Sequence, residues 1–186
     1  MKTGEEKQNT GRSGNALGIH VVAKPIGPQC NLDCEYCFYL EKNTLFPSGE
    51  SWRMSDEVLS RFITNYIKSQ PTPVVEFVWQ GGEPTLLGID FFRRVIALQQ
   101  PFARHKTITN ALQTNGTLLT DAWCEFLKQH HFMVGISLDG PQEIHDRYRR
   151  DRHGNGTFDA VMRGLRLLQK HQVEFNVLAC VALDTA

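Results

Sequence analysis

The sequence predicts an α/β fold, specifically a partial parallel (β/α) barrel of the TIM type that is truncated after its fifth strand. The first observation is that strand-like and helix-like segments alternate along the 186 residues with little sequence between them. The second is that the last strand-like segment, 173–183, stops just before Ala186. Because a buried parallel strand normally needs a covering helix and a further neighbour, we expect this chain to be the N-terminal part of a longer protein.

The predicted strands are short runs of apolar and β-branched residues. They cover 18–25, 74–79, 106–116, 132–140 and 173–183. Since helix-like segments connect them, the strands should pair in parallel through right-handed crossovers. Their carboxyl ends should then meet at one edge, which is where the active sites of β/α folds gather.

The predicted helices lie between the strands, at 55–70, 90–100, 121–131 and 158–172. Ser55 and Thr120 are suitable N-caps for the first and the third helix. The first helix also has one apolar face, made by Val58, Leu59, Phe62, Ile63, Tyr66 and Ile67. Between 140 and 158 the sequence predicts a polar, arginine-rich connection.

Composition and charge exclude several classes of function. Hydrophobic residues make up 41% of the chain and charged residues 22%, and 20 basic residues balance 20 acidic ones. This balance argues against a nucleic-acid partner, and no apolar run is long enough to span a membrane. Residues 1–17 lack the apolar centre of a secretory signal, so they predict a disordered polar tail before a domain at 18–186. We therefore expect a cytoplasmic protein, whose cysteines bind metal or are buried and do not form disulfides.

Three of the five cysteines lie close together after the first strand, in the spacing C-x3-C-x2-C: Cys30, Cys34 and Cys37. Three thiolates suit three corners of a 4Fe–4S cluster and leave one iron free to bind a ligand. The alternatives are a structural zinc site with His20 as the fourth ligand, or three buried thiols without metal. Cys124 and Cys180 lie in apolar segments, and we expect both to be buried.

The stretch CNLDCEYCFY resembles the cluster loop of the radical S-adenosylmethionine (radical SAM) superfamily. In that superfamily the amino and carboxylate groups of S-adenosylmethionine chelate the free iron. An aromatic residue at the position of Tyr36 lies beside the adenine of this cofactor. WQGGEP, after the second strand, resembles the superfamily's GGEP motif, which contacts the cofactor's amino group. The resemblance maps that motif onto Gly81, Gly82, Glu83 and Pro84. On its own, the same stretch would indicate a tight strand-to-helix turn.

Polar residues also end the third and fourth predicted strands, in LQTNG and GISLDG. Asn-Gly and Asp-Gly favour turns, so turn formation is an equal explanation for Asp139. The charged run HDRYRRDRH is either a solvated face or the source of one arginine for the cofactor. Together with the cysteine loop, these segments are similar to the anaerobic sulfatase-maturating enzymes from about residue 19 to the end of the chain.

This resemblance implies specific site residues. The cluster ligands would be Cys30, Cys34 and Cys37, and the cofactor contacts would be Tyr36, Gly82, Ser137 and Arg149. Further candidates for the pocket are Gln80, Gln113 and Tyr39.

The resemblance also implies a reaction. An electron from a donor such as a flavodoxin or ferredoxin would cleave S-adenosylmethionine to methionine and a 5′-deoxyadenosyl radical. The radical would remove a Cβ hydrogen from a Cys or Ser in an unfolded segment of a sulfatase, leading to Cα-formylglycine. The alternatives are another radical SAM enzyme that forms thioether or carbon–carbon crosslinks in peptides, and an iron–sulfur electron carrier.

The sequence departs from that family in one respect. Family members carry a cysteine-rich C-terminal region that binds two further iron–sulfur clusters and supplies a catalytic acid for the proton. No such region is present in this chain, so no catalytic residue is assigned in it, and the proton acceptor is expected beyond residue 186. We therefore expect this chain alone to cleave the cofactor weakly or not at all.

Overall fold

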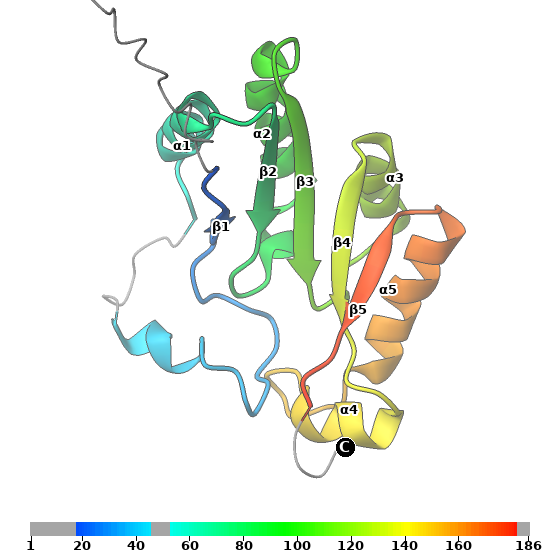
Figure 1. Cartoon of the computed structure of the whole chain (residues 1–186). Coiled ribbons are helices and arrows are strands. Elements are labelled where there is room, and N and C mark those ends of the chain that lie inside the picture. The colour runs from blue at the N-terminus through cyan, green and yellow to red at the C-terminus, as the bar shows by residue number, and fades with distance from the viewer. Residues whose placement is uncertain (1–17, 46–52, 182–186) are drawn as a thin grey trace, which may run out of the picture.

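The computed structural model describes residues 18–45 and 53–181 and contains one sheet of five strands. The strands follow one another across the sheet in chain order: β1 (Val21–Ala23), β2 (Val74–Trp79), β3 (Thr107–Thr114), β4 (Phe132–Ser137) and β5 (Phe175–Leu178). Every neighbouring pair is parallel, which confirms the predicted parallel α/β fold. Figure 1 shows the carboxyl ends of the strands directed toward the same edge of the sheet.

The strand register brings the ends of β2, β3 and β4 together. Trp79 at the end of β2 pairs with Leu112 of β3, and Thr114 at the end of β3 pairs with Ile136 of β4. The residues that follow these strands therefore emerge as neighbours at one edge, although they are far apart in the sequence. This edge is where the predicted site residues lie.

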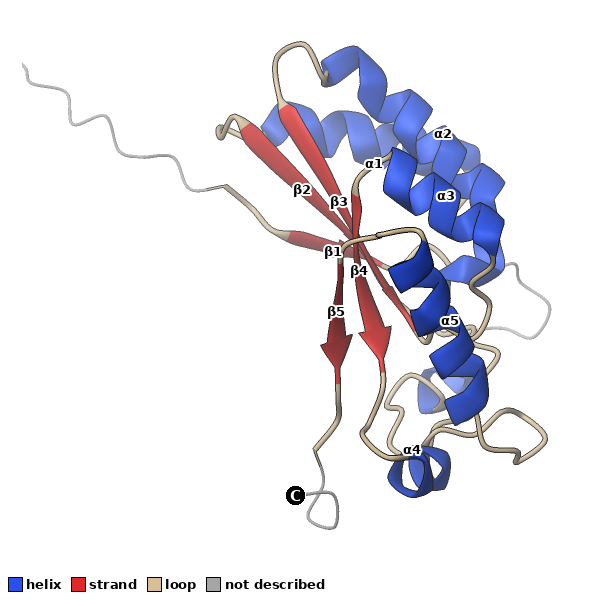
Figure 2. Ribbon diagram, turned by 90° about the vertical axis from the view of Figure 1, so that its right-hand side faces the viewer, coloured by secondary structure: helices blue, strands red, loops and turns tan. Residues whose placement is uncertain are grey.

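Four helices of the crossovers cover one face of the sheet: α1 (Asp56–Ser69), α2 (Ile89–Gln99), α3 (Asp121–Gln129) and α5 (Phe158–Lys170). Figure 2 shows them on one side of a curved sheet, the arrangement of a partial barrel. Both predicted N-caps are confirmed, because Ser55 accepts a hydrogen bond from the backbone N–H of Val58, and Thr120 accepts one from that of Trp123.

The core lies between the sheet and these helices and is rich in aromatic residues. Trp79 on β2 meets Phe91 and Phe92 of α2 edge to face, and none of the three side chains is exposed. The indole N–H of Trp79 donates to Oδ1 of Asn110, at 2.9 Å, so this polar atom is satisfied inside the core. Such packing fixes the strands whose ends carry the site.

The structure corrects two details of the prediction. The connection between β4 and α5 contains a short helix, α4 (Gln142–Tyr148). The sequence did not predict it, because its seven residues are mostly polar. Val58 was assigned to the apolar face of α1, but its side chain is 52% exposed, because it lies at the margin of that face. Short 3-10 helices also occur at Glu41–Leu45, Pro84–Leu87 and Gln100–Phe102.

Two further expectations concern membrane-spanning helices and the N-terminal tail. None of the helices that the structure describes is long and apolar enough to cross a membrane. The predicted polar tail, 1–17, lies outside the described residues.

Candidate functional site

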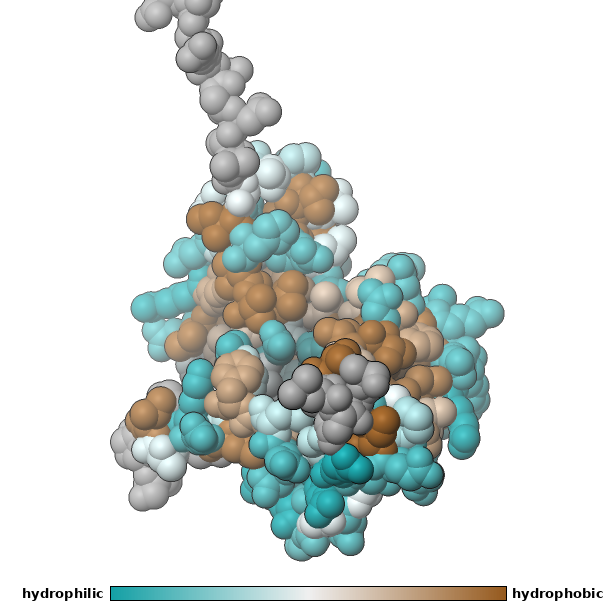
Figure 3. Space-filling model, turned by 60° about the horizontal axis from the view of Figure 1, so that its bottom comes forward, coloured by the Kyte–Doolittle hydropathy of each residue, from teal (hydrophilic) through white to brown (hydrophobic). Residues whose placement is uncertain are grey.

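A cavity of about 340 Å³ opens at the carboxyl edge of the sheet. It is bordered by the cysteine loop and by the ends of β2, β3, β4 and β5. Its lining includes all seven predicted site residues: Cys30, Cys34, Cys37, Tyr36, Gly82, Ser137 and Arg149. The further candidates Gln80, Gln113 and Tyr39 also line it. Figure 3 shows this side of the molecule, with apolar side chains in the middle of the face and polar ones around them.

The cysteine loop is fastened to the segment after α4. Backbone hydrogen bonds join Asp33 to Arg150, at 2.8 Å, and Glu35 to Tyr148, at 2.9 Å. Within the loop, the N–H of Cys37 donates to the carbonyl of Cys34, at 2.9 Å, which turns the chain. The loop is thus held at the helix side of the cavity.

The donor chemistry of this loop fits an iron–sulfur cluster. Burial raises the pKa of the Cys30 thiol, and it raises the pKa of Cys34 to about 12. Bound iron would favour the thiolate form instead. In the described part of the chain, however, no three His, Cys, Asp or Glu side chains already form a metal-binding group, so the thiols would have to reorient around the cluster.

The zinc alternative receives no support from His20. Its side chain is exposed, it lies 3.5 Å from the carboxylate of Glu76, and it is not part of the cavity lining. Two N–H groups approach the Cys30 sulfur instead, from the backbone of Leu32 at 3.4 Å and from the side chain of Asn115 at 3.7 Å. Such N–H···S contacts suit a thiolate ligand.

The two glycines after β2 let the backbone pack directly against the residues before Cys30. A Cβ atom on Gly82 would lie 1.8 Å from the carbonyl oxygen of Gln29, which is an impossible contact. The N–H of Gly82 donates to the carbonyl of Gly27, at 2.8 Å. Gly82 therefore has a structural reason to be glycine in addition to its place in the cavity wall.

Glu83, the acidic residue of the same turn, is completely buried below the cavity. Its Oε1 accepts hydrogen bonds from the N–H and hydroxyl of Thr85 and from the hydroxyl of Thr114, and its Oε2 accepts one from the N–H of Asn115. Burial raises the pKa of Glu83, and these hydrogen bonds oppose that shift. The carboxylate thus ties the β2 turn to the end of β3.

The ends of β3 and β4 are joined by a hydrogen bond between two predicted pocket residues. The side-chain amide of Gln113 donates to the hydroxyl of Ser137, at 3.1 Å. Gly135 makes room for this arrangement, because a Cβ atom there would lie 2.1 Å from Oε1 of Gln113.

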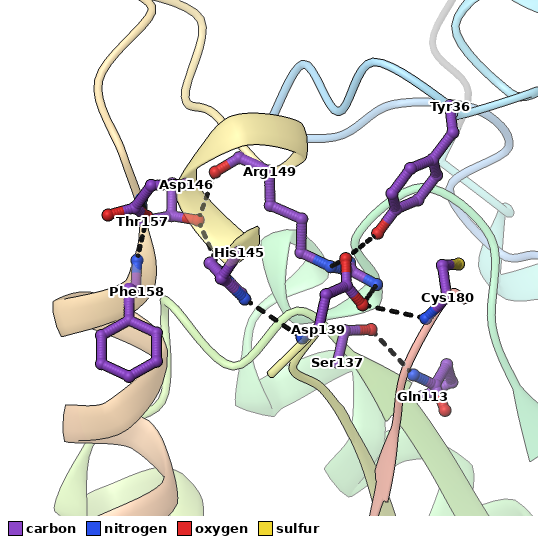
Figure 4. A network of polar contacts seen from close by, with 10 residues as sticks. All are labelled: Tyr36, Gln113, Ser137, Asp139, His145, Asp146, Arg149, Thr157, Phe158 and Cys180. Atoms are coloured by element: carbon purple, nitrogen blue, oxygen red, sulfur yellow. Dashed lines mark hydrogen bonds and ion pairs between the residues drawn. The ribbon is translucent and has the colours of Figure 1, made fainter. Parts of the chain in front are cut away.

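Asp139 is the centre of a polar network, shown in Figure 4. Its carboxylate accepts hydrogen bonds from Nε of Arg149, at 2.7 Å, from Nη2 of Arg149, at 3.1 Å, and from the hydroxyl of Tyr36. It also accepts one from the backbone N–H of Cys180, at 3.0 Å. The Arg149 guanidinium lies 5.4 Å from the centre of the Tyr36 ring. Asp139 is therefore more than the turn residue that the sequence also allowed.

The charges of this network shift the pKa values of its members in opposite directions. Burial alone would raise the pKa of Asp139, but the hydrogen bonds from Arg149, Tyr36 and Cys180 bring it below its ordinary value. Burial, followed by the hydrogen bond to Asp139, raises the pKa of Tyr36. The carboxylate and the guanidinium are consequently both charged, and the phenol stays protonated.

Sequence reasoning missed His145 entirely. It lies on α4, its side chain is fully buried, and its ring contacts both the backbone of Asp139 and the side chain of Thr157. No sequence signal distinguished it, because it falls within a run of charged residues that reads as a solvated face.

The two remaining cysteines have different environments. Cys124 on α3 is fully buried, as predicted. The prediction for Cys180 was wrong, since this residue is exposed. It follows β5, which is the last strand of the sheet and has exposed side chains at Val177 and Leu178. Apolar sequence there did not lead to burial, because no further strand covers β5 in the described part of the chain.

The chain matches a known family and several known proteins. The family model "Radical SAM superfamily" matches residues 25–184. A serine-type anaerobic sulfatase-maturating enzyme of Bacteroides thetaiotaomicron is 50% identical over 166 residues, which is 89% of this chain and 40% of that protein. A cysteine-type enzyme of the same name from Clostridium perfringens is 40% identical over 169 residues, covering 90% of this chain and 45% of that protein.

Solved structures agree with this assignment. Native anSMEcpe with bound AdoMet superimposes with a TM-score of 0.77 and 41% identity, covering 85% of this chain and 43% of that one. Native anSMEcpe with bound AdoMet and the Cp18Cys peptide also gives a TM-score of 0.77, with 40% identity, covering 86% and 42%. This chain therefore spans less than half the length of the two sulfatase-maturating enzymes named above. It belongs to the radical SAM superfamily.

Proposed function

We propose that this chain is the cofactor-binding part of an anaerobic sulfatase-maturating enzyme, which oxidises a Cys or Ser of a sulfatase to Cα-formylglycine. One observation carries the proposal: every predicted cluster and cofactor residue lines a single cavity at the carboxyl edge of the sheet. The superfamily is defined by a 4Fe–4S cluster and S-adenosylmethionine, so the chemical class of the cofactors follows from membership. The client and the product come from the names of the relatives.

In this proposal Cys30, Cys34 and Cys37 hold the cluster. When bound, the cluster and S-adenosylmethionine supply a 5′-deoxyadenosyl radical that removes a hydrogen atom from the substrate. The protein's own contribution is to bind, orient and shield these groups.

The cavity walls offer distinct contacts for the parts of this cofactor. The Tyr36 ring, which is 37% exposed, presents an aromatic face suited to the adenine. The Ser137 hydroxyl accepts a hydrogen bond from Gln113, as Figure 4 shows, and both residues line the same cavity. Arg149 supplies a positive charge for a carboxylate or a ribose oxygen.

No base for the reaction is assigned to this cavity. None of its described lining residues is Asp, Glu or His. We therefore assign the proton acceptor and the auxiliary clusters to the part of the longer relatives that this chain does not span. It also assigns a cytoplasmic location and an electron donor such as a flavodoxin or ferredoxin.

Anaerobic reconstitution with iron and sulfide tests the proposal. After reduction with dithionite in the presence of S-adenosylmethionine, the wild-type chain should release 5′-deoxyadenosine, even if slowly. Cys34→Ala should abolish the release, whereas Cys124→Ala, at a buried thiol outside the cavity lining, should retain it. A cluster whose electron paramagnetic resonance spectrum does not change on adding S-adenosylmethionine would contradict the proposal and favour an electron carrier.

The product identifies the reaction. The chain, extended to the full length of its relatives, should convert a Ser or Cys peptide to an aldehyde that reacts with a hydrazine probe. Mass spectrometry that finds a thioether or carbon–carbon crosslink instead would reject the sulfatase assignment and retain the superfamily.

A further inference from the structure

His145 on α4 is fully buried behind the cavity and forms hydrogen bonds with both of its ring nitrogens. Its Nδ1 lies 3.3 Å from the backbone nitrogen of Asp139, and its Nε2 lies 3.1 Å from the hydroxyl oxygen of Thr157. Figure 4 shows the ring between the end of β4 and the start of α5. None of these contacts belongs to the cavity lining itself.

The partners of this ring determine its tautomer. The backbone nitrogen of Asp139 can only donate, so Nδ1 must accept. Thr157 uses its single hydroxyl hydrogen to donate to the carbonyl of Arg149, at 2.8 Å, so toward His145 its oxygen must accept. Nε2 therefore carries the hydrogen, and the ring is neutral.

The surrounding charges agree with a neutral ring. Burial, followed by the charge of Arg149, lowers the pKa of His145, while Asp139 and Asp146 oppose the shift. From α5 the ring is faced by Phe158, at 5.7 Å between ring centres. A protonated ring would point a second N–H at the N–H of Asp139, which is repulsive.

One imidazole thus connects to the backbone of both members of the buried ion pair. It binds the N–H of Asp139 directly, and through the Thr157 hydroxyl it reaches the carbonyl of Arg149. Thr157 is itself held by its N–H, which donates to Asp146 at 2.7 Å. The carboxylate of Asp139 then orients Arg149 and Tyr36, both of which face the cavity.

We propose that His145 is a positioning residue of the cofactor cavity, which sets the relative placement of Asp139 and Arg149 and thereby aims Tyr36 and Arg149 at the bound ligand. The identity of that ligand, an adenine nucleoside sulfonium, rests on the proposed function. The positioning role itself rests only on the contacts within this chain.

Two isosteric substitutions separate the two hydrogen bonds of the ring. His145→Asn places an amide oxygen near the position of Nδ1, so it keeps the acceptor for Asp139 and loses the link to Thr157. His145→Gln places an amide nitrogen near the position of Nε2, so it keeps the donor for Thr157 and loses the link to Asp139. Both variants remove the same aromatic ring, and Asn is one methylene group shorter than Gln, so a general loss of packing would weaken His145→Asn at least as much as His145→Gln.

The first measurement is the dissociation constant of S-adenosylmethionine for the anaerobically reconstituted chain. Loss of the direct hydrogen bond to the N–H of Asp139 predicts roughly tenfold weaker binding for His145→Gln. A change of less than about threefold is expected for His145→Asn, because Thr157 keeps its own hydrogen bonds to the Arg149 carbonyl and to Asp146. The matched controls are His105→Gln and His105→Asn, at an exposed histidine before β3, which should bind as the wild type does. Equal weakening by both His145 variants, or by neither, would overturn the proposal.

A second measurement does not depend on cofactor binding, and its wild-type part does not depend on the folding of the variants. Nitrogen-15 NMR of the wild-type chain should show His145 with a protonated Nε2 and an unprotonated Nδ1, and the Nε–H of Arg149 should be protected from exchange. In His145→Gln that protection should fall, while in His145→Asn it should persist. The opposite tautomer would overturn the inference, whereas correct NMR signals without any S-adenosylmethionine binding would overturn the proposed function alone.

Discussion

Glu83 and Asp139 are both buried carboxylates at the carboxyl edge of the sheet, yet their surroundings differ in charge. The hydrogen-bond donors to Glu83 are neutral hydroxyls and backbone N–H groups, whereas Asp139 is paired with the guanidinium of Arg149. The pKa of Glu83 is raised, mainly by burial, and that of Asp139 is lowered, mainly by Arg149.

The difference reflects two tasks at one edge. Glu83 joins two adjacent strand ends, and neutral donors suffice for that. Asp139 joins β4, the cysteine loop, the segment after α4 and the end of β5, and it holds a cation at the cavity. Burial by itself therefore does not decide the ionisation of a carboxylate, because the counter-charge outweighs it.

The largest expected effect on stability is that of Asp139→Asn. It leaves Arg149 without a counter-charge in a buried site, where the side chain of Arg149 is 10% exposed and that of Asp139 is 1% exposed. Breaking such a pair should lower the free energy of unfolding by about 3 kcal/mol, at the lower end of the usual range because the pair borders the cavity. Urea denaturation measures this.

The double variant Asp139→Asn with Arg149→Met is the matched control, because it also removes the unpaired cation. It should recover part of the lost stability. If the single variant is as stable as the wild type, the ion pair does not hold this part of the structure together.

A smaller loss, about 2 kcal/mol, is expected for Glu83→Gln. The new amide keeps one oxygen for the donors around Oε1 but turns an NH2 group toward the N–H of Asn115. The same urea experiment measures it, with Glu125→Gln at an exposed position of α3 as the control that should change little. A loss larger than that of Asp139→Asn would reverse the contrast between the two sites.

The two carboxylates should also respond to pH in opposite directions. The folded protein holds the Glu83 proton more tightly than the unfolded chain does, so this residue's contribution to stability falls as pH rises from about 4 through the folded pKa. Asp139 has a lowered folded pKa, so its contribution is complete above about pH 4 and is lost as pH falls below about 4 and through the folded pKa.

Urea midpoints recorded across this acidic range test both directions. The stability difference between wild type and Glu83→Gln should shrink as pH rises, and the difference between wild type and Asp139→Asn should shrink as pH falls. Parallel curves for the two variants would contradict the assigned pKa directions.

The smallest effects concern single neutral donors. Thr114→Val removes one hydrogen bond to Glu83, and Tyr36→Phe removes one to Asp139. Each should cost roughly 1 kcal/mol in urea denaturation, and each should raise the pKa of its carboxylate. NMR titration of the two carboxyl carbons should show the larger rise at Glu83, because Arg149 still stabilises the Asp139 carboxylate. An equal rise would mean that the cation contributes less than its geometry indicates.

Much of the fold could be predicted from the sequence because its signals are local. Five strand positions, four helices and two N-caps follow from periodicity and capping within a few residues. The two exceptions have different causes. The helix α4 is too short and polar to show a period, and the environment of Cys180 depends on what lies beside β5.

Individual residues of the candidate site could be predicted only where they belong to a recognisable sequence motif. The cysteine spacing and the two glycines of the GGEP resemblance pointed to residues that the structure places around one cavity, whereas Glu83 and Pro84 of that resemblance lie outside its lining. His145 had no motif, and the sequence left Asp139 undecided between a turn and a rim residue.

The order of strands and helices and the chemical groups at the strand ends can be read from the sequence, because both depend on neighbouring residues. Which of these groups meet follows only from the way the strands and helices pack. Tyr36 and Asp139 are 103 positions apart, and Glu83 and Thr114 are 31 apart. Contacts over such separations arise from strand register and helix packing. These place a guanidinium beside Asp139 and only neutral donors beside Glu83.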